Sequence, residues 1–322
     1  MQELRHFFET YRKQHPITGQ PVGLYEPAEY IMNLGGKRFR PMLTFLGYQL
    51  FKDDLEKVLP IAYALEIFHN FSLVHDDIMD DADIRRGAAT VHTKWDVNTG
   101  ILSGDLMLVK SYEYLAEFEE EDKIPQLLRV FSRVAREVCE GQQMDVDFES
   151  REDVQIEEYI RMIALKTSVL LATCLEMGAI AAGADEASVK HCYEVGCNIG
   201  IAFQLQDDIL DTFGEGQKVG KRIGGDIIQN KKTFLILKAL ELGSAAQKAE
   251  LEQLMNSPTT DADAKVKAVK SILNELDILQ HAQEKKDHYR ALAFEHLEAL
   301  AAPAAKKAPL KAIMENLVKR DS

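Results

Sequence analysis

The chain has 322 residues, a formal net charge of −14 and a sequence pI of about 5.2. This acidic balance argues against a broad nucleic-acid-binding or anionic-membrane surface, although local clusters of Lys and Arg can still bind an anionic ligand. The hydrophobic fraction of 46% and the charged fraction of 28% are ordinary for a soluble globular protein of one large or two small domains.

Helical periodicity runs along the whole chain, and strand-like alternation is almost absent. Five long helices are predicted, over residues 61–80, 103–118, 124–148, 156–183 and 187–213. Breaks are predicted at residues 19–21, 86–87, 122–125, 214–225 and 257–261. Asp261 is a candidate cap for the helix that follows it. No linker is long enough to separate domains, so we expect one all-helical domain over residues 1–322.

The cysteines and the N-terminus bear on the compartment. The four cysteines form no CxxC pair and no zinc-binding spacing, and Cys174 and Cys192 have the apolar or small neighbours that buried free thiols have. The first residues lack the apolar core of a signal peptide. No stretch approaches about 20 unbroken apolar residues, since Glu176 interrupts the most apolar one. We therefore expect a reduced, cytoplasmic protein without an integral membrane segment.

A basic turn is predicted near the N-terminus, where the sequence GGKRFRP occupies residues 35–41. Its glycines permit a tight turn, and Lys37, Arg38 and Arg40 can bind an oxyanion. Taken alone, the segment is equally well interpreted as a solvated basic turn.

Two aspartate clusters of identical form, D-D-x-x-D, occupy residues 76–80 and 207–211, which places them 131 positions apart (207 minus 76). On helices, the first and last aspartates of each cluster project from one face. Two like charges at about 4 Å repel by roughly 4 kcal/mol at an effective dielectric of 20, so a multivalent cation is expected between them. Oxygen ligands without Cys or His favour Mg²⁺, with Mn²⁺ as an alternative, and Mg²⁺ completes its shell with water and phosphate oxygens. The clusters therefore predict a magnesium site for a phosphorylated substrate.

Basic residues follow both clusters. Arg85 and Arg86 stand just beyond the first cluster, where a helix would be ending and cations are favoured in any case. Lys221, Lys231 and Lys232 follow the second cluster, in and after a Gly-rich loop. Because both clusters have basic neighbours, we expect metal-bridged phosphates that Lys and Arg also bind. To share one substrate the clusters would have to converge, which favours a single domain with a central cavity.

Other polar residues stand in apolar helical stretches. Lysine is rarely buried without a partner, so Lys166, beside Thr167, is expected to face a polar cavity or else to reach the surface. Gln204 lies one helical turn before the middle aspartate of the second cluster, and Gln142 is three residues from Asp145. Gln204, Gln142 and Asp145 can also be interpreted as ordinary buried hydrogen-bonding groups.

Two histidines precede the first cluster. A lone histidine such as His69 is more often a core residue than a functional one. The adjacent His75 and Asp76 also match the metal-dependent HD phosphohydrolases. That interpretation needs further His ligands on separate helices and leaves the second aspartate cluster unexplained.

Together these segments resemble the trans-isoprenyl diphosphate synthases of the polyprenyl synthetase family, and most closely the short-chain geranylgeranyl and farnesyl diphosphate synthases. The resemblance runs from Gly35 to about Lys232 and rests on GGKRFRP (35–41), LVHDDIMDDADIRRG (73–87), GQQMD (141–145), KT (166–167), FQLQDDILD (203–211), GK (220–221) and NKK (230–232). It implies an all-α domain of antiparallel helices around a deep central cavity, the isoprenoid synthase type I fold, usually as a homodimer.

The resemblance also implies a reaction, the head-to-tail 1′-4 condensation of an allylic diphosphate with isopentenyl diphosphate. By matching positions, the metal ligands would be Asp76, Asp80 and Asp207, supported by Asp77, Asp208, Asp211, Gln142 and Asp145. The allylic diphosphate would contact Arg85, Lys221 and Lys231. Isopentenyl diphosphate would contact Lys37, Arg40, His69 and Arg86. The allylic group and its developing cation would lie against Lys166, Thr167 and Gln204.

Product length is implied by the residues just before the first cluster, which form the floor of the chain cavity in this family. Phe71 stands five residues before Asp76, and Ser72 stands four before it. A bulky residue at Phe71 implies a short product, C20 geranylgeranyl diphosphate first and C15 farnesyl diphosphate second. Helix geometry turns Phe71 about 140° away from the Asp76 face, so core packing is the alternative role.

Two other functions stay open from the sequence. A terpene cyclase shares the helical cavity and one Asp-rich cluster, but usually lacks the second cluster and the GGKRFRP segment. A non-catalytic subunit of a heteromeric synthase typically loses an aspartate cluster, and both clusters are present here.

Overall fold

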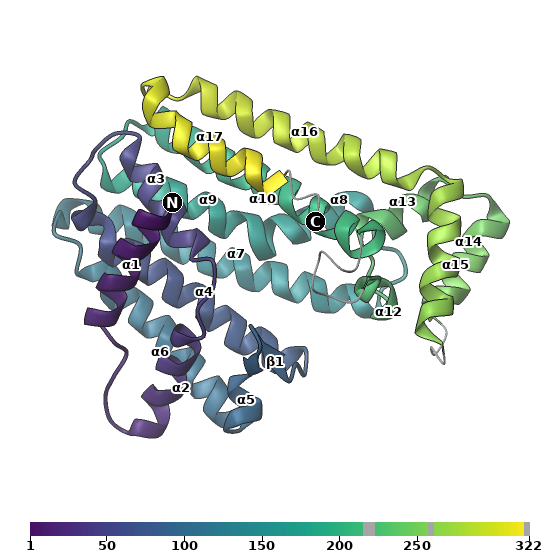
Figure 1. Cartoon of the computed structure of the whole chain (residues 1–322), viewed down its shortest axis with the longest axis horizontal. Helices are drawn as coiled ribbons and strands as arrows, with labels where there is room; N and C mark the ends of the chain where they lie inside the picture. The colour runs from purple at the N-terminus through teal and green to yellow at the C-terminus, as the bar shows by residue number, and fades with distance from the viewer. Residues whose placement is uncertain (215–222, 257–260, 319–322) are drawn as a thin grey trace. The chain divides into compact units, whose positions relative to one another are not determined.

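The computed structural model of the chain describes residues 1–214, 223–256 and 261–318. Within them the regular elements are helices, apart from one two-stranded hairpin, which confirms the all-α prediction (Figure 1). The chain divides into two compact units. One comprises residues 1–132, 173–190 and 302–306, and the other comprises residues 133–172, 191–301 and 307–322. The expectation of a single domain stays a prediction.

The first unit carries the N-terminal elements. These are α1 (Gln2–Gln14), α2 (Val22–Asn33), α3 (Phe39–Gln49), η1 (Leu55–Val58), α4 (Leu59–Met79), β1 (Ile84–Arg85), β2 (Ala88–Ala89), α5 (Val91–Lys94), α6 (Val97–Ala116) and η2 (Glu121–Lys123). Four helices have residues in both units: α7 (Ile124–Ser150), α9 (Val169–Ala181), α10 (Glu186–Phe213) and α17 (Ala304–Val318).

The second unit carries most of the C-terminal elements. These are α8 (Ile156–Ile163), the π-helical turn η3 (Ala164–Ser168), α12 (Gly225–Ile228), α13 (Phe234–Leu242), α14 (Ala245–Asn256), α15 (Ala262–Glu275) and α16 (Ile278–Ala299). The predicted cap of α15 is confirmed, because the Asp261 side chain accepts a hydrogen bond from the Ala264 N–H at 3.0 Å. The pair α14 and α15 lies side by side at the right of Figure 1.

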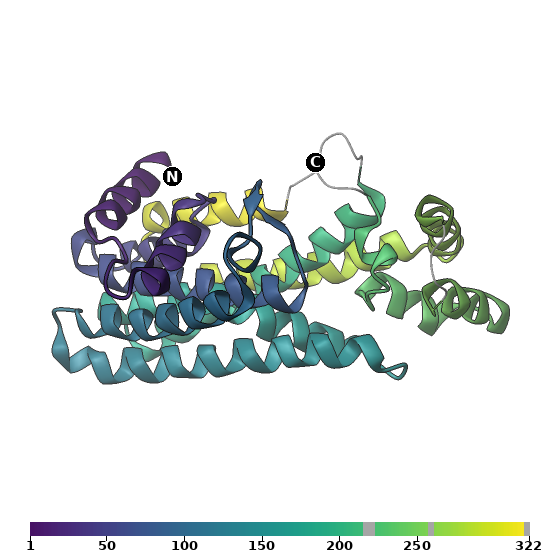
Figure 2. The same ribbon diagram turned by 90° about the horizontal axis from the view of Figure 1, so that it is seen from below.

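Helix α4 is the central helix of the first unit. Residues 61–68 in its first half are all buried and, apart from Glu66, apolar or aromatic, as expected of a helix that other elements surround. It packs along α6 and against α3. Its last turn carries the first aspartate cluster, so burial of the preceding residues fixes where that cluster emerges. The hairpin β1–β2 follows and projects from the helices of this unit (Figure 2).

In the second unit, α10 carries both core and site residues. Leu205 and Ile209 are buried in an apolar cluster that also contains Phe234 and Val269, while Asp207 on the same helix is exposed. The apolar spacing therefore fixes which side of α10 remains available to the second aspartate cluster.

The five predicted long helices all form, with ends shifted by a few residues, and the longest apolar stretch is interrupted by η3. Residues 156–181 form one helical stretch that is long and apolar enough to cross a membrane, yet 78% of its most apolar window is buried within the protein. This is the pattern of a core helix. All four cysteines are free, and Cys174 and Cys192 are buried as predicted.

Candidate active site

The first aspartate cluster lies at the C-terminal end of α4. The Asp80 N–H donates to the Asp76 carbonyl at 2.8 Å, so these two residues are one helical turn apart and share a face, as predicted. Asp80 is exposed and Asp76 is half-buried, whereas Asp77 is only 1% exposed. The two outer carboxylates are thus the ones placed to bind a ligand.

The buried Asp77 is paired with Arg85 of the hairpin. Arg85 Nε lies 2.7 and 2.8 Å from the two Asp77 carboxylate oxygens, and its Nη2 lies 2.6 Å from Oδ1. Arg86 and Gly87 form the two-residue turn, and both have positive φ, 53° and 79°, as a type I′ hairpin turn requires. The ion pair therefore holds the hairpin, and with it Arg86, against the end of α4.

The basic segment at 35–41 forms a tight turn, as predicted. Gly35, Gly36 and Arg38 have φ values of 77°, 128° and 51°, and α3 begins directly after them. A Cβ atom on Gly36 would lie 3.1 Å from the Arg86 guanidinium carbon, so the absent side chain leaves room for Arg86 to lie over this turn. Arg86 Nη1 donates to the Gly35 carbonyl at 2.6 Å.

The basic residues of this turn differ in their surroundings. Lys37 is exposed, and Arg40 is half-buried with an Nε that has no hydrogen-bond acceptor among the described residues. Arg38 is buried and forms ion pairs with Glu9 at 2.7 Å and Glu66 at 2.8 Å. Arg38 is therefore a buried residue that anchors the turn, while Lys37 is exposed and the Arg40 Nε lacks an acceptor among the described residues.

Burial and neighbouring positive charge dominate the electrostatics here. Burial lowers the pKa of His69 well below its ordinary value, and Arg40, Arg86 and Arg85 lower it further. Burial also lowers the pKa of Arg40 and of Arg86, and the Glu66 carboxylate opposes both shifts. A neutral His69 surrounded by guanidinium groups is an environment suited to a polyanion.

The second aspartate cluster has the same sequence form but different contacts. Asp207 is exposed, while Asp208 is buried and accepts a hydrogen bond from the Tyr159 hydroxyl at 2.5 Å. Burial raises the pKa of Asp208 well above its ordinary value; the Tyr159 hydrogen bond opposes this shift, and the charges of Asp226 and Asp207 add to it. Asp211 Oδ2 accepts from the Asp226 N–H at 3.0 Å, which ties α10 to the start of α12.

The lysines that follow the second cluster have different partners. Lys231 is exposed, and its Nζ lies 3.7 Å from Asp226 Oδ1. Lys232 donates to the Phe148 carbonyl at 2.7 Å and so caps the C-terminal end of α7. Lys221 lies outside the described residues.

Lys166 and Thr167 lie in the π-helical turn η3, a feature that the sequence pattern did not show. Lys166 is half-buried, and its Nζ forms an ion pair with Asp145 Oδ2 at 2.5 Å. A Cβ on Gly141 would lie 2.2 Å from the Lys166 backbone nitrogen, so this glycine allows α7 to approach the turn closely. π-helical turns inside helices are frequent at functional sites. Thr167, Gln142 and Gln204 are half-buried, which leaves each partly accessible.

Phe71 and Ser72 lie on α4 one turn before the first cluster. The Phe71 ring is half-buried, 5.5 Å from the Phe68 ring and 4.8 Å from the His75 ring between centroids. The Ser72 hydroxyl donates to the His69 carbonyl at 2.9 Å, within the same helix. Phe71 is therefore packed on its own helix while part of its ring stays accessible.

Each unit gathers one half of the predicted site. The first unit holds Lys37, Arg40, His69, Phe71, Ser72, Asp76, Asp77, Asp80, Arg85 and Arg86. The second holds Gln142, Asp145, Lys166, Thr167, Gln204, Asp207, Asp208, Asp211 and Lys231. The convergence of the two clusters on one substrate stays a prediction.

Sequence reasoning missed four residues that support these groups: Glu66, Asn70, Tyr159 and Asp226. Glu66 and Asn70 are four apart on α4 and precede Asp76 by ten and six residues, about three and two turns. That i, i+4 spacing of polar groups in an apolar helix was the available signal. Tyr159 and Asp226 are separated in sequence from the groups they contact, so spacing carried no comparable signal for them.

The donor set fits a hard cation. The exposed or half-buried carboxylates Asp76, Asp80 and Asp207 offer only oxygen ligands, which suits Mg²⁺ or Mn²⁺. In the part of the chain that the structure describes, no group of three His, Cys, Asp or Glu residues is arranged to hold an ion by itself. A hard cation bound at either cluster would therefore complete its shell with other oxygen ligands, such as water.

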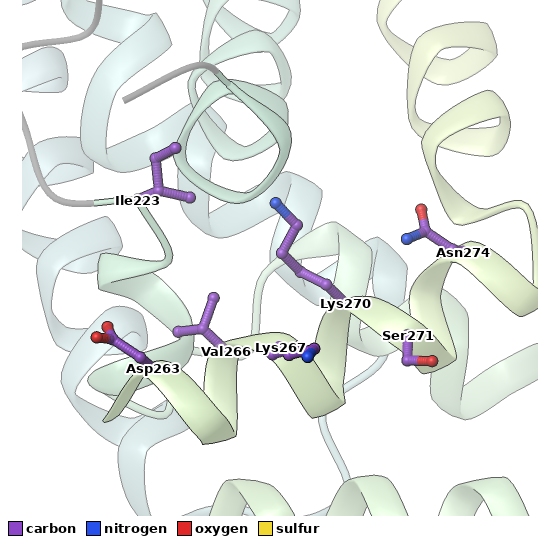
Figure 3. A pocket seen from close by; sticks show the side chains of 7 residues that line it. All are labelled: Ile223, Asp263, Val266, Lys267, Lys270, Ser271 and Asn274. Carbon is purple, nitrogen blue, oxygen red and sulfur yellow. The ribbon is translucent and has the colours of Figure 1, made fainter. Parts of the chain in front are cut away.

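A pocket of about 550 Å³ lies in the second unit. It is lined by Ile223 and by α15 residues Asp263, Val266, Lys267, Lys270, Ser271 and Asn274, and Figure 3 shows Val266 and Lys270 extending from α15 on the side of Ile223. None of the predicted site residues lines it.

Comparison with known proteins gives a consistent result. Residues 21–273 match the polyprenyl synthetase family. The chain is 42% identical over 243 residues to a short chain isoprenyl diphosphate synthase from Methanocaldococcus jannaschii, which covers 75% of this chain and 74% of that protein. It is 36% identical to a geranylgeranyl pyrophosphate synthase from Geoglobus acetivorans, over 87% of this chain and 86% of that one. A crystal structure of a geranylgeranyl pyrophosphate synthase matches with a TM-score of 0.94 and 44% identity, covering 100% of this chain and 99% of the other.

Proposed function

This chain belongs to the polyprenyl synthetase family, and from that premise we propose that it condenses isopentenyl diphosphate head to tail (1′-4) with allylic diphosphates to give short-chain, all-trans prenyl diphosphates. The observation that carries the proposal is the pair of D-D-x-x-D clusters with accessible outer aspartates. A cluster of arginines around a neutral histidine accompanies the first of them.

Allylic carbon–oxygen cleavage leaves negative charge on the diphosphate and positive charge on the allyl group. Asp76, Asp80 and Asp207 would hold Mg²⁺, with Mn²⁺ as an alternative. Bound there, the ion neutralises the charge that develops on the leaving diphosphate. Arg85, Lys221 and Lys231 would contribute positive charge to the same oxygens, which lowers the barrier. The Asp77 carboxylate holds Arg85 in place for this role.

Isopentenyl diphosphate is assigned to Lys37, Arg40, His69 and Arg86. These groups are cations or a neutral hydrogen-bonding ring, so they bind a diphosphate without a metal ion. Arg40 supports the assignment, since its buried Nε has no acceptor among the described residues. Holding the alkene beside the allylic carbon turns a bimolecular step into an effectively unimolecular one.

The developing allylic cation is assigned to the region of Lys166, Thr167 and Gln204. The Thr167 hydroxyl and the Gln204 carbonyl can turn their oxygen dipoles toward positive charge. The Lys166–Asp145 ion pair partly compensates the lysine charge, which would otherwise repel the cation. After the new carbon–carbon bond forms, the departing diphosphate is the base that takes the proton.

The product is assigned as C20, with C15 as the alternative, because Phe71 and Ser72 precede the first cluster. Removing the Phe71 ring by Phe71→Ala should lengthen the product if this side chain ends the chain cavity. An unchanged product distribution from that variant would leave Phe71 with its packing role against Phe68 alone.

The active form is assigned as a homodimer in the cytoplasm, in which residues 1–322 act as a single catalytic domain. Exposed apolar side chains along α6, namely Val97, Ile101, Leu102 and Val109, offer a surface for a second copy. Leu102 and Val109 are seven residues apart and so lie on one face. Four free cysteines suit a reducing compartment.

The decisive experiment supplies purified protein with Mg²⁺, radiolabelled isopentenyl diphosphate, and dimethylallyl, geranyl or farnesyl diphosphate in turn. Products are dephosphorylated and sized. A single C20 product from all three primers supports the assignment. A C15 product would select the shorter alternative, and products beyond C25 would overturn the assignment of Phe71 as the end of the chain cavity. Cyclic hydrocarbon without use of isopentenyl diphosphate would identify a cyclase. Turnover only after a second chain is added would identify a subunit of a heteromeric synthase.

A further inference from the structure

Glu66 is a buried acid at the centre of the basic cluster in the first unit. Its side chain is 3% exposed, and Oε1 accepts a hydrogen bond from Arg38 Nη1 at 2.8 Å. The same oxygen lies 3.3 Å from Asn70 Nδ2. A carboxylate this deeply buried is rare without charged partners. Its partners, Arg38 and Asn70, are themselves neighbours of the residues that we assign to isopentenyl diphosphate.

Asn70 connects Glu66 to Arg86 through hydrogen bonds from the two ends of its amide group. Its Nδ2 donates to the Glu66 carbonyl at 2.8 Å as well as to the Glu66 carboxylate, so its Oδ1 is left to accept from Arg86 Nη1 at 3.3 Å. Because an amide offers donors on one side and an acceptor on the other, these contacts fix which side faces Arg86. Arg86 then donates to the Gly35 carbonyl at 2.6 Å.

The chain of contacts thus connects α4 with the turn at 35–41. From the other side, Arg38 reaches Glu66 and also donates to the Met32 carbonyl at 2.6 Å, which anchors the same turn to α2. The Glu66 carboxylate interacts electrostatically with Arg38, Arg40 and Arg86, and in each case it favours the charged guanidinium. One acid therefore contributes to both the placement and the charge of three arginines.

We propose that Glu66 is a positioning residue for isopentenyl diphosphate binding, acting through Asn70 on Arg86 and through Arg38 on the turn that carries Lys37 and Arg40. The inference rests on the proposed function. Glu66 itself touches no substrate in this scheme. Its charge offsets the mutual repulsion of three guanidinium groups, of which those of Arg40 and Arg86 are assigned to the diphosphate.

Glu66→Gln tests the proposal, because it removes the charge and keeps the shape. We expect the KM for isopentenyl diphosphate to rise about tenfold, as for loss of one charge-assisted hydrogen bond, while the KM for the allylic primer changes less than about twofold. Calorimetric titration of isopentenyl diphosphate alone, without Mg²⁺, should show a similar rise in Kd, which does not depend on turnover.

Glu9→Gln is the matched control. Glu9 also forms an ion pair with Arg38, at 2.7 Å, and its second ion pair, at 2.9 Å, is with Arg12 on its own helix rather than with Arg86. Loss of Arg38 pairing alone would therefore affect both variants equally. We expect Glu9→Gln to leave both KM values within about twofold of the wild type, since its pair is more exposed. Equal rises in the two variants would contradict the proposed action through Asn70.

Asn70→Ala tests the connection itself and serves if Glu66→Gln fails to fold. Because Glu66 and Asn70 act in series, the double variant should raise the KM for isopentenyl diphosphate no further than the larger single change. Additive effects, or an equal rise in the KM for the allylic primer, would overturn the inference. Wild-type protein that neither binds nor consumes isopentenyl diphosphate would instead refute the proposed function.

Discussion

The two D-D-x-x-D clusters share one sequence form but differ in how the middle aspartate is held. In the first unit, Asp77 is buried against a cation, with Arg85 within 2.6–2.8 Å of its oxygens. In the second unit, Asp208 is buried against a neutral group, the Tyr159 hydroxyl at 2.5 Å. The outer aspartates Asp80 and Asp207 are exposed in both cases.

The difference shows that the buried middle aspartate of one motif can be stabilised in two ways, by an ion pair or by a hydrogen bond from a neutral group. Asp77 keeps its charge compensated by an ion pair, which at the same time anchors the hairpin. Burial raises the pKa of Asp208 well above its ordinary value, and negative neighbours add to the shift, so the charged form of this acid is disfavoured. The first unit therefore places cations beside its cluster, whereas the second places a further acid, Asp226, beside Asp208 and Asp211.

The largest effect is expected where the clusters are alike. Asp76→Asn and Asp207→Asn should each lower kcat about 10³-fold, the scale for losing one group that stabilises developing charge. Removal of metal with EDTA should abolish turnover, and Mg²⁺ should restore it. Steady-state assays check both, with the exposed Glu250→Gln on α14 as a control that keeps its activity. Normal turnover by either Asn variant would remove that cluster from the metal site.

The next effect separates the clusters. Asp77→Asn should lower the free energy of unfolding by about 2 kcal/mol, because a hydrogen-bonded charge pair is lost. Asp208→Asn should lower it by about 1 kcal/mol, because burial already disfavours the charged form of this acid and the amide oxygen can still accept from the Tyr159 hydroxyl. Urea unfolding without Mg²⁺ measures both. Equal losses, or a larger loss at Asp208, would mean that the two environments do not differ in charge compensation as described.

A smaller effect is expected at the basic turn, which belongs to the first unit only. Gly36→Ala places a Cβ at 3.1 Å from the Arg86 guanidinium and at a φ of 128°. The displaced Arg86 should raise the KM for isopentenyl diphosphate by up to about tenfold. Gly23→Ala is the matched control, because a Cβ there meets no atom within 4 Å. If both variants behave like the wild type, the contact between Arg86 and the turn has no role in binding.

The smallest effect is a dependence on pH that follows from the cation-rich first unit. Burial and neighbouring arginines lower the pKa of His69 well below its ordinary value. Between the ordinary pKa and the lower folded-state pKa, the unfolded chain binds more protons than the folded one, so this residue makes stability fall as the pH falls through that range. His69→Gln should therefore lose less stability than the wild type between pH 7.5 and 5.5.

Urea unfolding at the two pH values measures this difference, with the exposed His6→Gln as a control that should follow the wild type. A wild type and a His69→Gln variant with parallel pH profiles would show that His69 titrates normally in the folded protein.

Much of the fold could be predicted from local pattern. The five long helices, the cap at Asp261, the turn at residues 35–41 and the buried cysteines are all confirmed. Helical periodicity and turn chemistry depend on neighbours within a few residues, so the sequence shows them directly. The hairpin after the first cluster and the π-helical turn at Lys166 were missed, because strands of two residues and a single widened turn have too few residues to form a period.

By itself the sequence determined the all-helical class, the two aspartate clusters and the basic segments around them, since each rests on residue type at short spacing. Only the tertiary structure decided that Asp77 has Arg85 as its partner, that Asp208 has Tyr159, and that Glu66 lies among three arginines. Asp208 and Tyr159 are 49 positions apart, and Glu66 and Arg38 are 28 apart. Pairs at such separations form through the packing of whole helices, and this packing also sets the burial that shifts their pKa values.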